Sequence, residues 1–333
     1  MQSSKPSMPA VIAHCDWSKD PKKRWMTVAI RSGDCWAAYA PEPVSVTADL
    51  LDRLEMRAIE PGPLFVGFDF PIGLPLQYAL RTGFKNFREA LKHFGDGQWA
   101  QWFIVANDAT EVSLRRPFYP QRPNGKRRAD LIERLGVAKM EELLRVCERR
   151  TSDRLAASSL FWTLGPSQVG KATISGWREV IKPSVLTDRI LLWPFDGALS
   201  ELFGKGKPVL AETYPGETYV QIGIPHRCTG SKKKRGGRLS ASPYLNDWLG
   251  HRPVVPEPQL CAAIADGFGD AACSEDQFDA VVGLFGMIDV AIGVRTDGVP
   301  EDEDIRRWEG WILGQSPGMG CTHLPGWGTP RQS

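Results

Sequence analysis

Residues 64 to 71 read LFVGFDFP, a nearly continuous apolar run that carries a single carboxylate, Asp69, and closes at Pro71. Such a run is typical of a strand buried on both faces of a sheet, where no alternate position has to meet water. We therefore expect a strand from Leu64 to Phe70 in the middle of a sheet, with Asp69 near its carboxyl end.

The residues before this run predict its neighbours. A helical spacing of apolar residues covers 46–59 and is stopped by prolines at 61 and 63. A right-handed crossover through this helix would place the strand at 64–70 parallel to the first strand of the chain. Asp16 and Asp69 would then reach one edge of an α/β sheet, where such sheets bind ligands. Three β-type runs separated by turn residues form the preceding meander: VIAHCDWS (11–18), RWMTVAIRS (24–32) and DCWAAYAPE (34–42).

The remaining sequence predicts one core interrupted by a long segment. Residues 11–75 and 206–313 supply the sheet core, and 76–205 read as a mostly helical insertion or cap. Residues 1–10 are expected to form a flexible tail and 314–333 an irregular tail. Within the core, PVLAETYP (208–215) predicts a further strand. A last helix is expected from Ser274, which has a capping-box spacing to Gln277, to about Val294.

Acidic residues occur on these predicted core elements. Asp276 and Asp279 share one face of the last helix, and Gly283 and Gly286 continue that stripe, so the helix can lie close against another backbone. Asp276 has an alternative explanation, since an acid in the first turn favours the helix dipole. Glu212 lies in an apolar strand, where a carboxylate is costly unless it is paired or binds a cation. Oxygen clusters of this kind suit Mg²⁺ or Mn²⁺.

The order of these elements resembles the ribonuclease H-like fold, with acids arranged as in RuvC-type resolvases. More closely, CDWS, GFDFPIGLP, AETYP and DQFDA resemble the domain of unknown function 429 family, which is predicted to contain nucleases. The likeness covers the core elements, roughly half of the chain.

This resemblance implies hydrolysis of a phosphodiester with two metal ions. Asp16 would bridge the metals, Asp69, Glu212 and Asp279 would be further ligands, and Asp276 a spare. Ribonuclease H proper takes one acid from its first helix, where this chain has Glu55. The sequence leaves open whether Glu55 faces the site.

Two stretches are rich in cations. SKKKRGGR (231–238) predicts a mobile loop whose side chains neutralise substrate phosphates, or else a solvated surface loop. A second stretch, 115–128, interleaves six cations with Phe118 and Tyr119 and either stacks against a nucleic-acid strand or forms plain surface. The predicted substrate-binding residues of the first stretch are Lys232, Lys233, Lys234, Arg235 and Arg238.

The stretch GPSQVGKAT (165–173) matches a phosphate-binding loop only in part, since Ala172 stands where a Ser or Thr would bind magnesium. A phosphate-binding loop of this kind follows a strand, and that strand would have to be SSLFWTL (158–164). We expect instead a surface or active-site loop in which Ser167 and Lys171 contact phosphate.

Composition sets the broad class. The chain has 333 residues, 42% of them hydrophobic, and a net charge of +2, so affinity for nucleic acid must come from local clusters. Seven scattered cysteines and the absence of an export signal favour a cytoplasmic protein without membrane insertion. The leading hypothesis is a divalent-metal-dependent nuclease acting on DNA or RNA. The alternatives are a non-catalytic nucleic-acid-binding module of the same fold and a nucleotide-binding phosphotransferase of the actin and sugar-kinase type.

Overall fold

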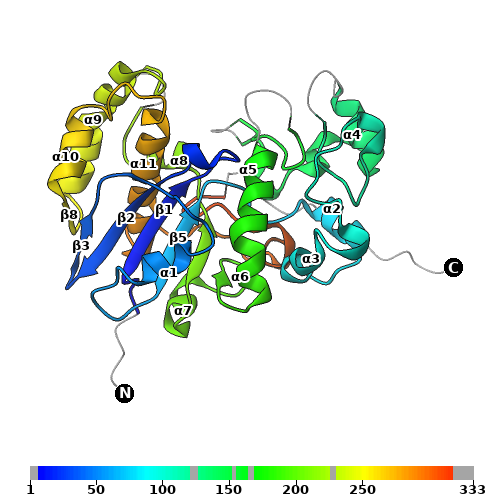
Figure 1. Cartoon of the computed structure of the whole chain (residues 1–333), viewed down its shortest axis with the longest axis horizontal. Helices are drawn as coiled ribbons and strands as arrows, with labels where there is room; N and C mark the ends of the chain where they lie inside the picture. The colour runs from blue at the N-terminus through cyan, green and yellow to red at the C-terminus, as the bar shows by residue number, and fades with distance from the viewer. Residues whose placement is uncertain (1–6, 121–126, 152–154, 164–168, 226–229, 318–333) are drawn as a thin grey trace.

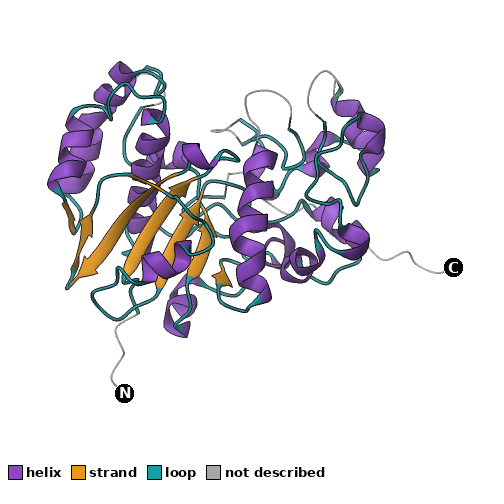
Figure 2. Cartoon of the chain, viewed as in Figure 1, coloured by secondary structure: helices purple, strands orange, loops and turns teal. Residues whose placement is uncertain are grey.

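A computed structural model describes residues 7–120, 127–151, 155–163, 169–225 and 230–317. Its centre is a mixed sheet with the strand order β6-β7-β5-β1-β2-β3-β8, flanked by helices on both faces (Figure 1, Figure 2). This is the α/β arrangement of the ribonuclease H-like fold that the sequence predicts, including the meander, the crossover and a mostly helical segment after the core strands.

The strand pairings confirm the predicted order and direction of the core strands. β1 (Val11–Asp16) pairs antiparallel with β2 (Trp25–Ser32), which pairs antiparallel with β3 (Cys35–Ala38). After the short α1 (Leu50–Glu55), β5 (Leu64–Phe68) returns parallel to β1, and β7 (Val209–Glu212) adds parallel to β5. The carboxyl ends of β1, β5 and β7 therefore lie at one edge.

Three very short strands were not predicted. β4 (Glu42–Pro43) pairs with β2, β8 (Val254–Pro256) extends the sheet beside β3, and β6 (Leu191–Leu192) extends it beside β7. Runs of two or three residues contain too little periodicity to be recognised in a sequence. β6 comes from the predicted insertion 76–205, so this segment contributes a strand to the core sheet.

Alternate residues of the strands face two separate cores. Ala13 and Cys15 face the core formed with α1 and the helical segment, whereas Ile12 faces the core beneath α11 (Ser274–Ala291). In Figure 1, α11 lies behind β1 and β2, and α5 and α6 run beside the parallel edge of the sheet.

The predicted close approach of the last helix is confirmed. A Cβ atom on Gly283 would lie 2.2 Å from the His14 ring of β1, and one on Gly286 would lie 2.6 Å from Thr218 of α8 (Pro215–Gln221). Glycine at these positions lets α11 pack directly on the sheet and on α8. The predicted capping box is wrong, because Ser274 is already helical and its hydroxyl donates to the carbonyl of Phe268.

The other helices are distributed over the helical segment and the carboxyl-terminal half. Residues 235–238, predicted as loop, are the first turn of α9, so this part of the prediction is wrong. In the described part of the chain, no helix is long and apolar enough to cross a membrane. The helices are α2 (Leu76–Ala79), α3 (Phe87–His93), α4 (Arg128–Leu135), α5 (Val169–Gly176), α6 (Lys182–Leu186), α7 (Leu199–Leu202), α9 (Arg235–Gly250) and α10 (Pro258–Ala265).

Candidate functional site

Two carboxyl groups meet where β1 and β5 end. Cys15 pairs with Phe68 in the parallel ladder, so the next residue of each strand, Asp16 and Asp69, stand side by side. The two side chains are hydrogen-bonded to each other. The backbone N–H of Trp17 donates to Oδ1 of Asp69 over 2.6 Å and fixes that carboxyl group. The prediction that these two residues converge at the sheet edge agrees with this geometry.

The helix α11 brings a third carboxylate to the pair. Asp279 is 7% exposed and accepts hydrogen bonds from the Tyr219 hydroxyl of α8 and from the ammonium group of Lys232. Lys232 Nζ also lies 3.5 Å from Glu275 of α11. The negative charge of Asp279 is therefore neutralised by a lysine of the same chain.

Burial and mutual repulsion control the protonation of these groups. Burial, reinforced by Asp69 and Asp279, raises the pKa of Asp16 well above its ordinary value. Burial raises the pKa of Asp69 to about 7, although the Trp17 N–H and the Asp16 hydrogen bond act in the opposite direction. Near neutral pH the Asp16 and Asp69 pair therefore retains a proton, which a bound cation would displace.

Asp279 and its partners are shifted in the same environment. Burial raises the pKa of Asp279 even though Lys232 lowers it. Burial by itself would lower the pKa of Lys232, but the charge of Asp279 outweighs it and holds this pKa above its ordinary value. Asp276, one turn earlier on α11, is half-buried, and burial together with Asp279 raises its pKa to about 6.

Glu212 is not part of this cluster. It pairs with Phe68 in the β5–β7 ladder, so its side chain points to the sheet face opposite Asp16 and Asp69, and Thr213 takes the position beside Asp69. Arg145 binds both of its carboxylate oxygens at 2.6 Å, and the N–H of Ile72 donates to one of them at 2.7 Å. The predicted ligand role of Glu212 is therefore not retained, since alternation along β7 directs it into a buried ion pair.

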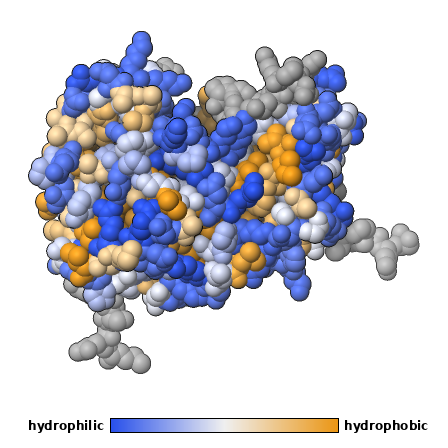
Figure 3. All heavy atoms as spheres, viewed as in Figure 1, coloured by the Kyte–Doolittle hydropathy of each residue, from blue (hydrophilic) through white to orange (hydrophobic). Residues whose placement is uncertain are grey.

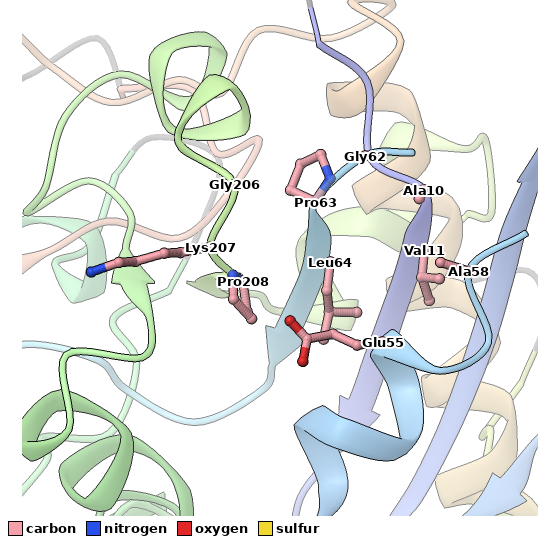
Figure 4. A pocket seen from close by; sticks show the side chains of 10 residues that line it. All are labelled: Ala10, Val11, Glu55, Ala58, Gly62, Pro63, Leu64, Gly206, Lys207 and Pro208. Carbon is pink, nitrogen blue, oxygen red and sulfur yellow. The ribbon is translucent and has the colours of Figure 1, made fainter. Parts of the chain in front are cut away.

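Glu55 also lies away from the cluster. It lines a pocket of about 170 Å³ with Val11 and Leu64, where β1 and β5 begin, and Figure 4 shows its carboxylate at this opposite end of the sheet. Its carboxylate accepts a hydrogen bond from Arg189 over 2.5 Å. Unlike the first-helix acid of ribonuclease H proper, Glu55 on α1 therefore lies at the edge of the sheet opposite Asp16 and Asp69.

The predicted cationic residues have different positions. Arg238 is buried and donates to the backbone carbonyls of Gly267, Lys232 and Gly269, which fastens the start of α9 to the turn before α11. Arg235 pairs with Asp266. Both are therefore engaged by the protein itself. Lys233 and Lys234 are exposed beside Lys232 and remain accessible.

The partial phosphate-loop match is not supported by its surroundings. Residues 155–163 contain no strand, and a phosphate-binding loop requires one before it. Lys171 lies in the first turn of α5, whereas Ser167 lies outside the described residues. In the stretch 115–128, Arg115 binds Gln98 and Arg116 pairs with Glu111; Arg122 and Lys126 also lie outside the described residues.

A divalent cation fits the donor chemistry of this cluster. Asp16 and Asp69 present hard oxygen ligands, and burial raises the pKa of both carboxyl groups. Within the described ranges, however, no three His, Cys, Asp or Glu side chains stand close enough to hold a metal ion together. The third carboxylate, Asp279, is held in an ion pair with Lys232.

Comparisons with protein-family models, curated proteins and solved structures found no match to the chain.

Two residues of the cluster were missed in the sequence. Trp17 acts through its backbone N–H, for which a sequence carries no signal, and Tyr219 was hidden because it belongs to a helix, α8, that had no predicted place.

Proposed function

We propose that this chain is a divalent-cation-dependent nuclease or phosphodiesterase, related to the domain of unknown function 429 family that its motifs resemble. The observation that carries the proposal is the hydrogen-bonded pair of Asp16 and Asp69 at the ends of neighbouring central strands, faced by Asp279 of α11. Paired carboxyl groups at this edge of a mixed sheet are suited to holding a hard cation against a phosphate.

Each residue of the cluster has a distinct task in this proposal. Asp16 and Asp69 would hold the cation, which when bound supplies activation of water and stabilisation of the leaving oxygen. The Trp17 N–H fixes the orientation of Asp69, and Tyr219 fixes that of Asp279. Lys232 presents a positive charge at the rim of the cluster, where it can bind a substrate phosphate when it leaves Asp279.

The test is calorimetric titration of Mn²⁺ into the wild type, Asp16→Asn and the control Asp247→Asn, an exposed residue of α9. Each protein is also incubated with labelled single-stranded and double-stranded DNA and RNA, with Mn²⁺ or with EDTA. We expect Mn²⁺ binding and metal-dependent cleavage in the wild type and control, and loss of both in Asp16→Asn. Cleavage that persists in Asp16→Asn or in EDTA would contradict the proposed site.

A second function is favoured by the ion pair between Lys232 and Asp279. A cluster already neutralised by its own lysine needs no metal, which is compatible with a non-catalytic nucleic-acid-binding module. In that case the same assays would show nucleic-acid binding by wild type and Asp16→Asn alike, with neither Mn²⁺ binding nor cleavage.

A further inference from the structure

A cleft of about 420 Å³ opens between the segment after β1 and the helix α5. Its apolar wall is formed by Phe103, Val105 and Ile174. Figure 3 shows apolar surface beside α5, bordered by hydrophilic side chains. A cleft with an apolar wall and a charged rim is suited to a ligand that has both characters.

The charge of this cleft is positive and not neutralised. Lys19, Lys171 and Arg178 line it, and within the described part of the chain none of these three has an ion-pair partner. Glu179 also lines the cleft, but both of its oxygens are bound by Arg24, at 2.5 and 3.0 Å. Among the described residues that line the cleft, the three cations have no ion-pair partner, whereas Glu179 is paired with Arg24.

Two of these cations, Lys19 and Lys171, act on each other. Burial lowers the pKa of Lys171, and the like charge of Lys19 lowers it further. Like charges gathered around a partly buried space favour the binding of an anion between them.

One residue joins this cleft to the acidic cluster. The backbone N–H of Trp17 donates to Asp69, and its indole N–H donates over 3.0 Å to Ser175, which lines the cleft. The Arg24 guanidinium lies over the Trp17 ring, 4.3 Å from its centre. Trp17 therefore contacts both Asp69 of the acidic cluster and Ser175 of the cleft.

We propose that this cleft holds a nucleotide next to the scissile phosphodiester of a single-stranded nucleic acid. The three cations bind its phosphate and the apolar wall receives its sugar or base. This inference rests on the proposed function, which places the reacting phosphate at Asp16 and Asp69. It adds the substrate class: a single strand brings an unpaired, flexible nucleotide, whose base can lie against an apolar wall.

The test compares the wild type with the double variant Lys171→Gln/Arg178→Gln. A matched control, Lys205→Gln/Lys207→Gln, removes the same charge at the opposite end of the sheet, where Lys207 lines the pocket of Figure 4. Binding of short fluorescein-labelled DNA and RNA single strands is followed by anisotropy over a range of salt, in EDTA so that no cleavage occurs. Cleavage with Mn²⁺ is measured separately.

Each phosphate contact contributes about 0.7 to the slope of log affinity against log salt for single strands. If the two removed cations contact phosphates, the slope should fall by about 1.4, and affinity near 0.1 M salt should drop roughly 25-fold. The control should keep the wild-type slope and affinity.

Three outcomes separate the two proposals. Weaker single-strand binding and a smaller salt slope in Lys171→Gln/Arg178→Gln, but not in the control variant, support the proposed role of the cleft. Unchanged single-strand binding in that variant overturns the cleft, whether or not the wild type cleaves with Mn²⁺. A wild type that neither binds nor cleaves any strand overturns the cleft together with the proposed function.

Discussion

Removing the guanidinium group of Arg145 should strongly destabilise the fold, although Arg145 does not contact the residues of the acidic cluster. Arg145 is fully buried and donates to Glu212 at 2.6 Å, to Glu148 at 3.0 Å and to the backbone carbonyl of Glu309 at 3.1 Å. In Arg145→Met the carboxylates of Glu212 and Glu148 would stay buried without a counter-charge. Breaking a buried pair in this way costs about 3–5 kcal/mol, a large part of a typical unfolding free energy of about 5–15 kcal/mol.

The partner variant separates a structural role of Glu212 from a catalytic one. Glu212→Gln removes the charge but keeps an oxygen that can accept the Ile72 N–H. Combined with Arg145→Met, it should cost about 0.5–3 kcal/mol less than the sum of the single variants, because one of the two charges left unpaired by the first change is gone.

The assay is urea unfolding followed by circular dichroism and tryptophan fluorescence, at pH 5.5 and pH 8. Burial already raises the pKa of Glu148, and Arg145 opposes that shift. Without Arg145 the folded state would hold protons that the unfolded state releases above its ordinary carboxyl pKa of about 4.3. The variant should therefore lose more stability at pH 8 than at pH 5.5.

Two results would refute this reasoning. An unfolding free energy within about 1 kcal/mol of wild type in Arg145→Met would show that the pair is not an essential buried interaction. Loss of metal-dependent cleavage in Glu212→Gln at unchanged stability would restore Glu212 to the active site.

Three further changes test the packing and charge of the cluster. Gly283→Ala should cost about 1–3 kcal/mol in urea unfolding, because its methyl group would overlap the His14 ring, whereas Gly236→Ala, in open space on α9, should not destabilise. Burial raises the pKa of Asp16 and raises that of Asp69 to about 7, so the melting temperature measured in EDTA should fall as the pH rises through 7. This fall should be smaller in Asp16→Asn. A fall of unchanged size in that variant would contradict the pairing of the two carboxyl groups. Lys232→Met should tighten Mn²⁺ binding by about tenfold or more in calorimetry, because the Asp279 carboxylate that Lys232 neutralises becomes available. Weaker binding in this variant would show that Asp279 is not a ligand.

The acidic cluster was only partly predictable. Asp16, Asp69 and Asp279 come together because their elements were recognised and strand ends of one sheet edge must meet. Glu212 was assigned to the same cluster because it too stands at a strand end, but its face depends on the register of β7 against β5. A shift by one residue exchanges the two faces of a strand, and no local sequence signal sets that register.

The sequence by itself determined the sheet core, since apolar runs, turn residues and the glycine stripe of the last helix are local patterns with a strict period. Tertiary structure alone decided which charges are available. Arg145 neutralises Glu212 across 67 residues and Lys232 neutralises Asp279 across 47. Lys19 lines one cleft with Lys171 and Arg178, although it precedes the insertion and the other two lie far inside it. Ion pairing depends on distance in space, which a chain fixes only when its elements pack.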